Sequence, residues 1–258
     1  MTDDYIELDG GKCHQRLIRE SEAKSDEGGL FGRLWEAESH DIKTAVVREV
    51  NYSTAKEVID RYEWLGTMPA VVLHCYGLYF GDACAGVVVY SPEYIENLGA
   101  WDSYGYTGKI ILLARGACVH WAHEHSASKL IRGSMKLLPK RYRVVTATVD
   151  ASAGEIGTIY QACGFDYVGV MSAGGNRATI ITDKGSHISG RQARRDYSTE
   201  GVIGLRTLGV SVESVARKGR YFGFIGPPKE VAKLRSAIAG KIKPYPKRAA
   251  QAKLIETD

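Results

Sequence analysis

Hydrophobic and polar positions alternate along the chain with two different periods, and together they predict a mixed α/β fold. Runs of apolar and β-branched residues are typical of strands, and they lie at 44–50, 70–80, 83–91, 109–118, 143–150, 166–171, 178–182 and 218–225. Apolar residues recur every three or four positions in segments typical of helices, at 54–65, 126–138, 155–163 and 227–239. Hairpin-like strands precede alternating strands and helices, so the order predicts a mixed sheet with helices on its faces.

Local signals sharpen several of these elements. Thr54 and Glu57 have the spacing of a capping box at the start of the first predicted helix. The apolar positions of this helix share one face, which is expected to be buried: Ala55, Val58, Ile59 and Tyr62. Gly81-Asp82 separates two apolar runs, which predicts a β-hairpin. Residues 1–43 show little periodicity and are expected to form an irregular extension.

The composition excludes several classes of protein. Hydrophobic residues make up 44% of the 258 residues and charged residues 25%, which is ordinary for a globular chain and argues against disorder or collagen. No apolar run approaches the roughly 18 residues of a membrane span, and the acidic start MTDDYIELDGGK does not resemble a secretory signal. Five cysteines without a C-x-x-C pair argue against a disulfide framework or a zinc ribbon. A cytoplasmic protein is therefore expected.

The net charge of +4 hides an uneven distribution. Residues 183–258 carry 16 Lys/Arg and 7 Asp/Glu, whereas the rest of the chain is mildly acidic. Such asymmetry suggests a polyanionic partner, although a solvated tail has the same composition. We therefore expect three regions, namely an irregular extension over 1–43, a catalytic domain over 44–182 and a basic, nucleic-acid-contacting extension over 183–258.

The segment HWAHEHSASKLIRG, which follows the predicted strand 109–118, leads into a helix. The free N–H groups and the positive dipole end of a helix N-terminus attract anions, so a phosphate or pyrophosphate is expected there. The residues concerned are Glu124, His125, Ser126, Ala127 and Ser128. This is not a P-loop, its histidines match no common metal-ligand spacing, and surface or capping roles are the alternative.

A second candidate site follows the predicted strand 143–150. Asp150 ends that strand, and Glu155 lies between Gly154 and Gly157 at a helix start. The carboxyl ends of strands in α/β sheets are where ligands bind. A phenol of pKa near 10 suits Tyr160 as an acid that protonates a departing thiolate. In the alternative, Glu155 only complements the helix dipole and Tyr160 packs in the core.

Aromatic and basic residues mark two further segments. Glu63 and Trp64 lie at the end of the first predicted helix, where Trp64 could stack on a base or simply cover the sheet. Beyond residue 190, basic and aromatic residues are interleaved, a mixture suited to phosphate contacts and base stacking. The candidates are Arg194, Arg195, Lys218, Arg220 and Tyr221, and a solvated face is the alternative.

These motifs resemble the phage Mom family. The run Asp150-x4-Glu155-x-Gly157-Thr-Ile-Tyr160-Gln161-Ala162 is similar to that family's Asp-x4-His-x-Gly-x-Ile-Tyr-Gln-Ala, and Glu63-Trp64-Leu65-Gly66 is similar to its His-Tyr-Leu-Gly. Ser126 stands where the family places a Ser at the start of the cofactor-side helix. Arg194-Arg195 and Lys218-Gly-Arg220-Tyr221 are similar to the family's basic ending. Two glutamates, at positions 63 and 155, replace histidines that are common in the family.

The order of elements resembles the fold of the Gcn5-related N-acetyltransferases (GNAT). The resemblance implies a mixed, mostly antiparallel central sheet flanked by helices, with a basic C-terminal extension. Mom proteins add a carbamoylmethyl group to the exocyclic amine of adenine in DNA, which blocks restriction enzymes. The resemblance implies that Asp150, Tyr160 and Ser126 are functional positions. The implied donor is acetyl-CoA or another thioester or activated donor.

Three functions follow from these observations. The leading hypothesis is a GNAT-like transferase that modifies a nucleobase amine, adenine N6, in phage DNA. Its catalytic residues would be Tyr160, Asp150, Glu155 and Glu63. The second hypothesis is an acyl- or aminoacyltransferase acting on a small amine, a protein or RNA. The third is a nucleic-acid-binding protein without catalysis.

Overall fold

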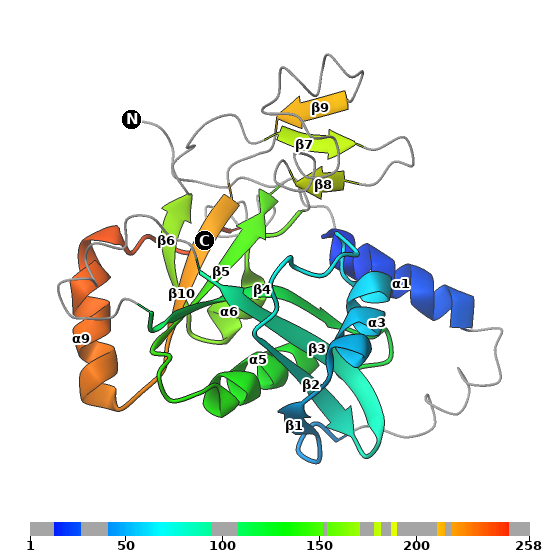
Figure 1. The fold of residues 1–258 in the computed structure, drawn as a ribbon, viewed down its shortest axis with the longest axis horizontal. Coiled ribbons are helices and arrows are strands. Elements are labelled where there is room, and N and C mark those ends of the chain that lie inside the picture. The colour runs from blue at the N-terminus through cyan, green and yellow to red at the C-terminus, as the bar shows by residue number, and fades with distance from the viewer. Residues whose placement is uncertain are drawn as a thin grey trace, which may run out of the picture.

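A computed structural model gives the structure of the protein (Figure 1). It describes residues 13–26, 41–93, 108–151, 154–170, 178–181, 187–189, 211–214 and 218–247. The predictions for Arg194 and Arg195 lie outside the described residues.

The body of the molecule is a seven-stranded sheet with the order β1-β2-β3-β4-β5-β10-β6. Its strands are β1 (Val46–Glu49), β2 (His74–Phe80), β3 (Ala83–Pro92), β4 (Ile110–Cys118), β5 (Val144–Asp150), β6 (Asp166–Val170) and β10 (Lys218–Phe224). Neighbouring strands are antiparallel except for the parallel pair β4 and β5. The predicted mixed, mostly antiparallel sheet is confirmed.

Helices flank this sheet. They are α1 (His14–Asp26), α3 (Tyr52–Tyr62), α5 (Ser126–Leu137), α6 (Thr158–Ala162) and α9 (Pro228–Ile238), followed by the short 3-10 helix η2 (Ala239–Lys241). The buried face of α3 consists of the four apolar residues that its periodicity predicts. Its cap differs from the prediction, because Asn51 precedes the helix and its side chain accepts the N–H of Thr54 at 2.8 Å. An Asn at this position satisfies an otherwise unpaired donor of the first turn.

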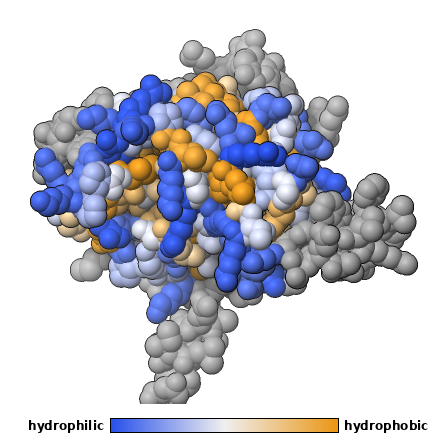
Figure 2. Space-filling view, turned by 90° about the horizontal axis from the view of Figure 1, so that it is seen from below, coloured by the Kyte–Doolittle hydropathy of each residue, from blue (hydrophilic) through white to orange (hydrophobic). Residues whose placement is uncertain are grey.

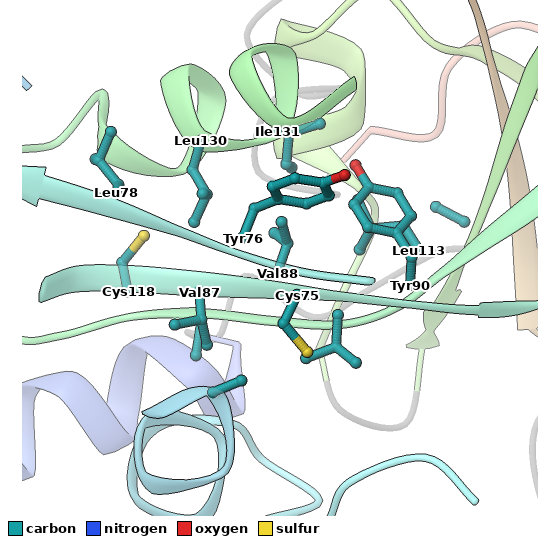
Figure 3. Packing of buried hydrophobic residues seen from close by; sticks show 14 of the residues in the cluster. Cys75, Tyr76, Leu78, Val87, Val88, Tyr90, Leu113, Cys118, Leu130 and Ile131 are labelled. Atoms are coloured by element: carbon teal, nitrogen blue, oxygen red, sulfur yellow. The ribbon is translucent and has the colours of Figure 1, made fainter. Parts of the chain in front are cut away.

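The core lies on both faces of the sheet. Leu130 and Ile131 point from α5 onto one face, whereas Val87 points from β3 to the opposite face, which α3 covers (Figure 3). The hydroxyl of Tyr90, a fully buried residue, pairs with Ser134 Oγ at 2.8 Å, so this large side chain is buried without an unpaired polar atom. Full burial of an apolar side chain such as that of Leu130 contributes about 1.5–3 kcal/mol to the stability of the fold.

The C-terminal region contributes to the same sheet. β10 inserts between β5 and β6, so the main sheet extends well beyond residue 182. A second sheet, with the order β8-β7-β9, precedes β10 in the chain and consists of β7 (Ala178–Ile181), β8 (His187–Ser189) and β9 (Ser211–Ser214). Figure 1 shows this small sheet beyond the end of the main sheet at which β5 finishes and β10 starts. The basic segment over residues 183–258 therefore supplies one strand of the main sheet.

Helix α9 is fixed on the outer part of the sheet by both apolar and charged contacts. Leu234 and Ile238 are buried against Val144 and Phe222. Arg235 donates two hydrogen bonds to the carboxylate of Asp166 on β6, at 2.6 and 2.7 Å. A two-pronged contact of this kind adds geometric specificity to the attraction between the charges.

The N-terminal region differs from the prediction. Residues 14–26 form the helix α1, where an irregular segment was expected. The sequence gives a weak signal here because no side chain that the structure describes in α1 is buried, so the helix has no apolar stripe to detect. Figure 1 shows α1 beside α3.

The surface shows no large separate apolar region in the view from below. Apolar patches alternate there with hydrophilic side chains (Figure 2). Among the helices that the structure describes, none has the length and apolar character needed to cross a membrane.

Candidate active site

The strands β4 and β5 separate halfway along their length. Their parallel pairing stops at Leu113 and Ala147, although β4 continues to Cys118 and β5 to Asp150. At the same point, the register between β3 and β4 shifts, and Ala114 becomes an extra residue in β4. Such a bulge bends its strand, which explains why β4 leaves β5. The separation leaves this part of β4 without a partner strand on the side of β5, next to the carboxyl end of β5, where ligands bind in α/β sheets.

Asp150 lies at this end of β5 and is 3% exposed. Lys218 is its register partner on β10, and Lys218 Nζ lies 3.2 Å from Asp150 Oδ2. A buried carboxylate needs such a partner because desolvation otherwise disfavours its charge. Lys218, which the sequence analysis assigned to nucleic acid, therefore belongs to the same site as Asp150.

Glu155 joins this site from the loop between β5 and α6. Its carboxylate accepts the backbone N–H of Asp150 at 3.3 Å. Burial raises the pKa of Glu155 to about 7, and the charges of Glu63 and Asp150 act in the same direction. A carboxyl with a pKa near neutrality can both accept and release a proton under physiological conditions.

Glu63 follows the last residue of α3 and is 8% exposed. Its Oε2 accepts the backbone N–H groups of Leu65 and Gly66 at 2.8 and 3.1 Å. Burial raises the pKa of Glu63, and the nearby Arg115, whose Nε lies 3.9 Å from Oε2, opposes that rise. We refer to Glu63, Asp150 and Glu155 as the carboxylate cluster.

Tyr160 is positioned by α6 and is partly buried. Its ring centroid lies 5.5 Å from the rings of both Phe165 and Tyr221. Burial raises the pKa of its hydroxyl, and the charges of Glu155 and Glu63 raise it further. Among the described residues, the Tyr160 hydroxyl has no hydrogen-bond partner. The hydroxyl therefore keeps its proton at neutral pH and has it available for a ligand.

The start of α6 is fixed against the core by Tyr221. Gly157 has φ +76°, and a Cβ there would lie 2.4 Å from the Tyr221 ring, so only glycine fits. The Tyr221 hydroxyl donates to the backbone oxygen of Ile156 at 2.6 Å, and Gln161 donates to both groups at 3.1 Å. Gly157 and Gln161 of the motif, together with Tyr221, thus fix the helix that carries Tyr160.

Ser126 is the first residue of α5 and is fully buried. Its hydroxyl has no hydrogen-bond partner in the part of the chain that the structure describes. The N-cap His125 makes no capping bond, and the N–H groups of Ala127 and Ser128 meet no acceptor among the described residues. Unpaired donors at a helix start and an unpaired buried hydroxyl are the groups that an anionic ligand satisfies.

The other predicted site residues have varied positions. Glu124 and His125 are exposed, and their side chains lie 3.6 Å apart. Trp64 is half-buried and meets the ring of His14 edge-on at 6.0 Å. Arg220 is partly buried on β10.

Tyr221 requires a correction. It is 0% exposed and forms part of the core, so its ring is not available for stacking on a base. Successive side chains of β10 point to opposite faces of the sheet, and both faces are covered, because Tyr221 belongs to the main core and Phe222 packs with Leu234 and Ile238 of α9.

Arg115 is the site residue that the sequence analysis missed. Besides approaching Glu63, it donates to the backbone oxygens of Thr67 at 2.9 Å and Ala114 at 2.7 Å. Arg115 thus connects the turn after α3 with the part of β4 that has separated from β5. The signal was present in the sequence as a single charge inside the apolar run KIILLARGAC. The described residues contain no group of three or more His, Cys, Asp and Glu side chains placed to hold a metal ion.

Comparisons with known proteins agree with the predicted resemblance. The chain matches the model of the Mom protein family over residues 44–247. None of the curated proteins matches it.

Among solved structures, three acetyltransferases are similar to the chain. An acetyltransferase of the GNAT family from Bacillus cereus has 9% identity and a TM-score of 0.39, covering 71% of this chain and 99% of that one. An IAA acetyltransferase from Bacillus cereus has 14% identity and a TM-score of 0.39, covering 70% and 99%. A spermidine N-acetyltransferase from Vibrio cholerae in complex with CoA and spermine has 9% identity and a TM-score of 0.39, covering 70% and 96%.

The family match includes both the segment that contains Glu63 and the segment from Asp150 to Ala162. It also extends through β10, the strand that supplies Lys218. The chain belongs to the Mom protein family.

Proposed function

We propose that this protein is a transferase that modifies the exocyclic amine of a nucleobase, adenine N6, in DNA and thereby protects phage DNA from restriction. The observation that carries the proposal is the joint position of the carboxylate cluster and Tyr160 at the end of β5. This end lies beside the part of β4 that leads to the unsatisfied start of α5. Membership of the Mom family supports the choice of DNA as the acceptor.

The start of α5 suits a CoA-type donor, with acetyl-CoA or another thioester as the candidate. Ser126 Oγ and the N–H groups of Ala127 and Ser128 would hold the donor's phosphates, because they are donors that otherwise meet no acceptor among the described residues. Glu124 and His125 lie at the rim of this position. Such a donor supplies an activated carbon and a thiolate leaving group.

Glu155 is the member of the carboxylate cluster that best suits a general base. Asp150 has Lys218 at 3.2 Å, and Glu63 has Arg115 at 3.9 Å. No Lys or Arg lies within ion-pair distance of Glu155 among the described residues, and its pKa is raised to about 7. Asp150 and Glu63 would then orient the amine, while Glu155 takes its proton.

Tyr160 is the corresponding general acid. Its raised pKa keeps the phenol protonated at neutral pH, so the hydroxyl is available as a donor to the departing sulfur. An adenine amine is a poor nucleophile, so the rate depends mainly on how well the site aligns the two reactants. The base must also leave the helix stack to reach a site of this depth.

DNA would be held by basic residues of the C-terminal region and by Trp64, which follows α3. Arg194 and Arg195 are candidates for contacts with the phosphate backbone, and Arg220 is a further one. Trp64 is half-buried, which leaves part of its ring for contact with a displaced base.

The test is to express the protein in bacteria, digest the DNA to nucleosides and identify modified bases by mass spectrometry. The wild type is expected to produce a modified adenine, whereas Glu155→Gln and Tyr160→Phe are expected to lose it while remaining folded. Tyr52→Phe is the matched control, because Tyr52 is 51% exposed on α3 and outside the site. Unmodified DNA with soluble wild-type protein and saturating donor would refute the assignment of DNA and favour a small amine, a protein or RNA as the acceptor.

A further inference from the structure

We propose that α1 is an autoinhibitory strap, which occupies the backbone edge of β4 that the donor needs and must move before the donor binds. This inference rests on the proposed function, because it assumes a CoA-type donor between the separated ends of β4 and β5. It concerns a segment, residues 14–26, to which the catalytic proposal gives no role.

The edge in question is the part of β4 beyond its contact with β5, residues 114–118, which we call the open edge. The direction of its backbone groups follows from the pairing with β3. Val119 donates its N–H to Ala85, which makes these residues a hydrogen-bonded pair of the antiparallel ladder. Bonded and non-bonded pairs alternate, so Gly116, opposite Val88, directs its N–H and C=O away from β3. The carbonyl of Gly116 therefore faces the side on which β4 has separated from β5.

A side chain of helix α1 donates a hydrogen bond to the carbonyl of Gly116. The side chain of Gln15 donates from Nε2 to the oxygen of Gly116 at 2.8 Å, over a sequence separation of 101 residues. One turn later, Arg19 donates from Nη2 to the oxygens of His120 and Ala122, at 3.2 and 3.1 Å. The helix thus covers both the open edge and the loop that leads to Ser126.

The same helix reaches the other half of the site. His14 meets the ring of Trp64 edge-on at 6.0 Å, and Glu22 forms an ion pair with Arg61 near the end of α3. These contacts place α1 between the end of α3 on one side and the loop before α5 on the other.

The attachment of α1 is weak enough to be reversible. None of its described side chains is buried, and Leu17 is 47% exposed. The contacts named above are hydrogen bonds, one exposed ion pair and one ring contact, and each contributes little net free energy because water competes for the same groups. A segment bound in this way can detach without unfolding the core.

A donor with a pantetheine arm would compete directly with Gln15. The arm carries two amide groups on an extended chain, which suit the unpaired backbone groups of a strand edge. The side chain of Gln15 is also an amide, and it presents the same N–H donor to Gly116. An extended arm along the open edge would need the space that Gln15 fills, so the apparent affinity for the donor is reduced according to the fraction of molecules in which α1 is attached.

The experiment measures the Kd of CoA by calorimetry for the full chain and for two variants that loosen α1. Gln15→Ala removes the contact with Gly116, and Glu22→Gln weakens the ion pair with Arg61 without touching the loop before α5. Each variant is expected to bind CoA roughly 2- to 10-fold more tightly than the wild type. Arg16→Ala is the matched control on the same helix, because its side chain is 66% exposed and pairs with Glu20 within α1.

Hydrogen exchange of the α1 amides with and without CoA gives the second readout, and protection is expected to fall when CoA binds. Unchanged or weaker CoA binding in both variants, with a wild type that binds CoA, would overturn the strap and leave the donor site standing. A rise in α1 protection on binding would also overturn it, since α1 would then close over the donor. Absence of CoA binding in all four proteins would overturn the donor site and the strap together.

Discussion

Replacing Glu155 by glutamine should stabilise the fold while it abolishes activity. Burial and the neighbouring carboxylates raise the pKa of Glu155 from 4.5 to about 7. As the pH rises through this interval, the unfolded chain loses the proton and the folded protein keeps it, so the free energy of unfolding falls. At about 1.4 kcal/mol for each pKa unit, the loss reaches roughly 3 kcal/mol above pH 7. Glutamine carries no charge, keeps an oxygen for the N–H of Asp150 and avoids this loss.

The assay is equilibrium unfolding in urea at pH 4.5 and pH 8 for the wild type and Glu155→Gln. Relative to the wild type, the free energy of unfolding of the variant should rise by up to about 3 kcal/mol from pH 4.5 to pH 8. This rise should be complete at about pH 7. Glu57→Gln is the control, because Glu57 is exposed on α3 and its charge costs no desolvation. A difference between Glu155→Gln and the wild type that stays constant with pH would refute the reasoning from burial.

Three further predictions concern the residues that build the site. Gly157→Ala should destabilise the fold by more than about 2 kcal/mol, because its Cβ would meet the Tyr221 ring at 2.4 Å and φ is +76°; thermal unfolding measures this, and a loss below about 0.5 kcal/mol would contradict the close approach. Lys218→Met removes the cation beside the buried Asp150 and should cost roughly 2–3 kcal/mol in urea unfolding, whereas Lys218→Arg, which keeps the charge, should cost less; equal losses in the two variants would argue against a charge effect. Asn51→Ala should cost about 1 kcal/mol through loss of the cap on α3, whereas Asn51→Asp should retain most of the stability, and equal losses in both would exclude capping as the cause.

The carboxylate cluster combines features that favour catalysis over stability. Asp150 and Glu63 are buried beside cations, whereas Glu155 is partly buried next to two other carboxyl groups. An arrangement of this kind lowers the stability of the folded chain at neutral pH and is retained where a proton has to move. The replacement of two family histidines by Glu63 and Glu155 thus keeps groups that can act as bases, since burial brings the pKa of Glu155 close to that of an imidazole.

The sequence by itself determined most of the individual helices and strands. The periodicity of α3 and the turn at Gly81-Asp82 predicted elements that the structure contains, because both signals depend on local spacing. The motif from Asp150 to Ala162 pointed to the candidate site for the same reason, as its residues are neighbours in the chain.

Only the tertiary structure decided how distant segments combine. The insertion of β10 between β5 and β6, which brings Lys218 to Asp150 and buries Tyr221, depends on strand pairing over nearly 70 residues, for which local patterns give no signal. The helix α1 escaped prediction because polar contacts hold it and leave no apolar stripe in the sequence. The raised pKa of Glu155 likewise depends on burial among groups that only the folded chain brings together.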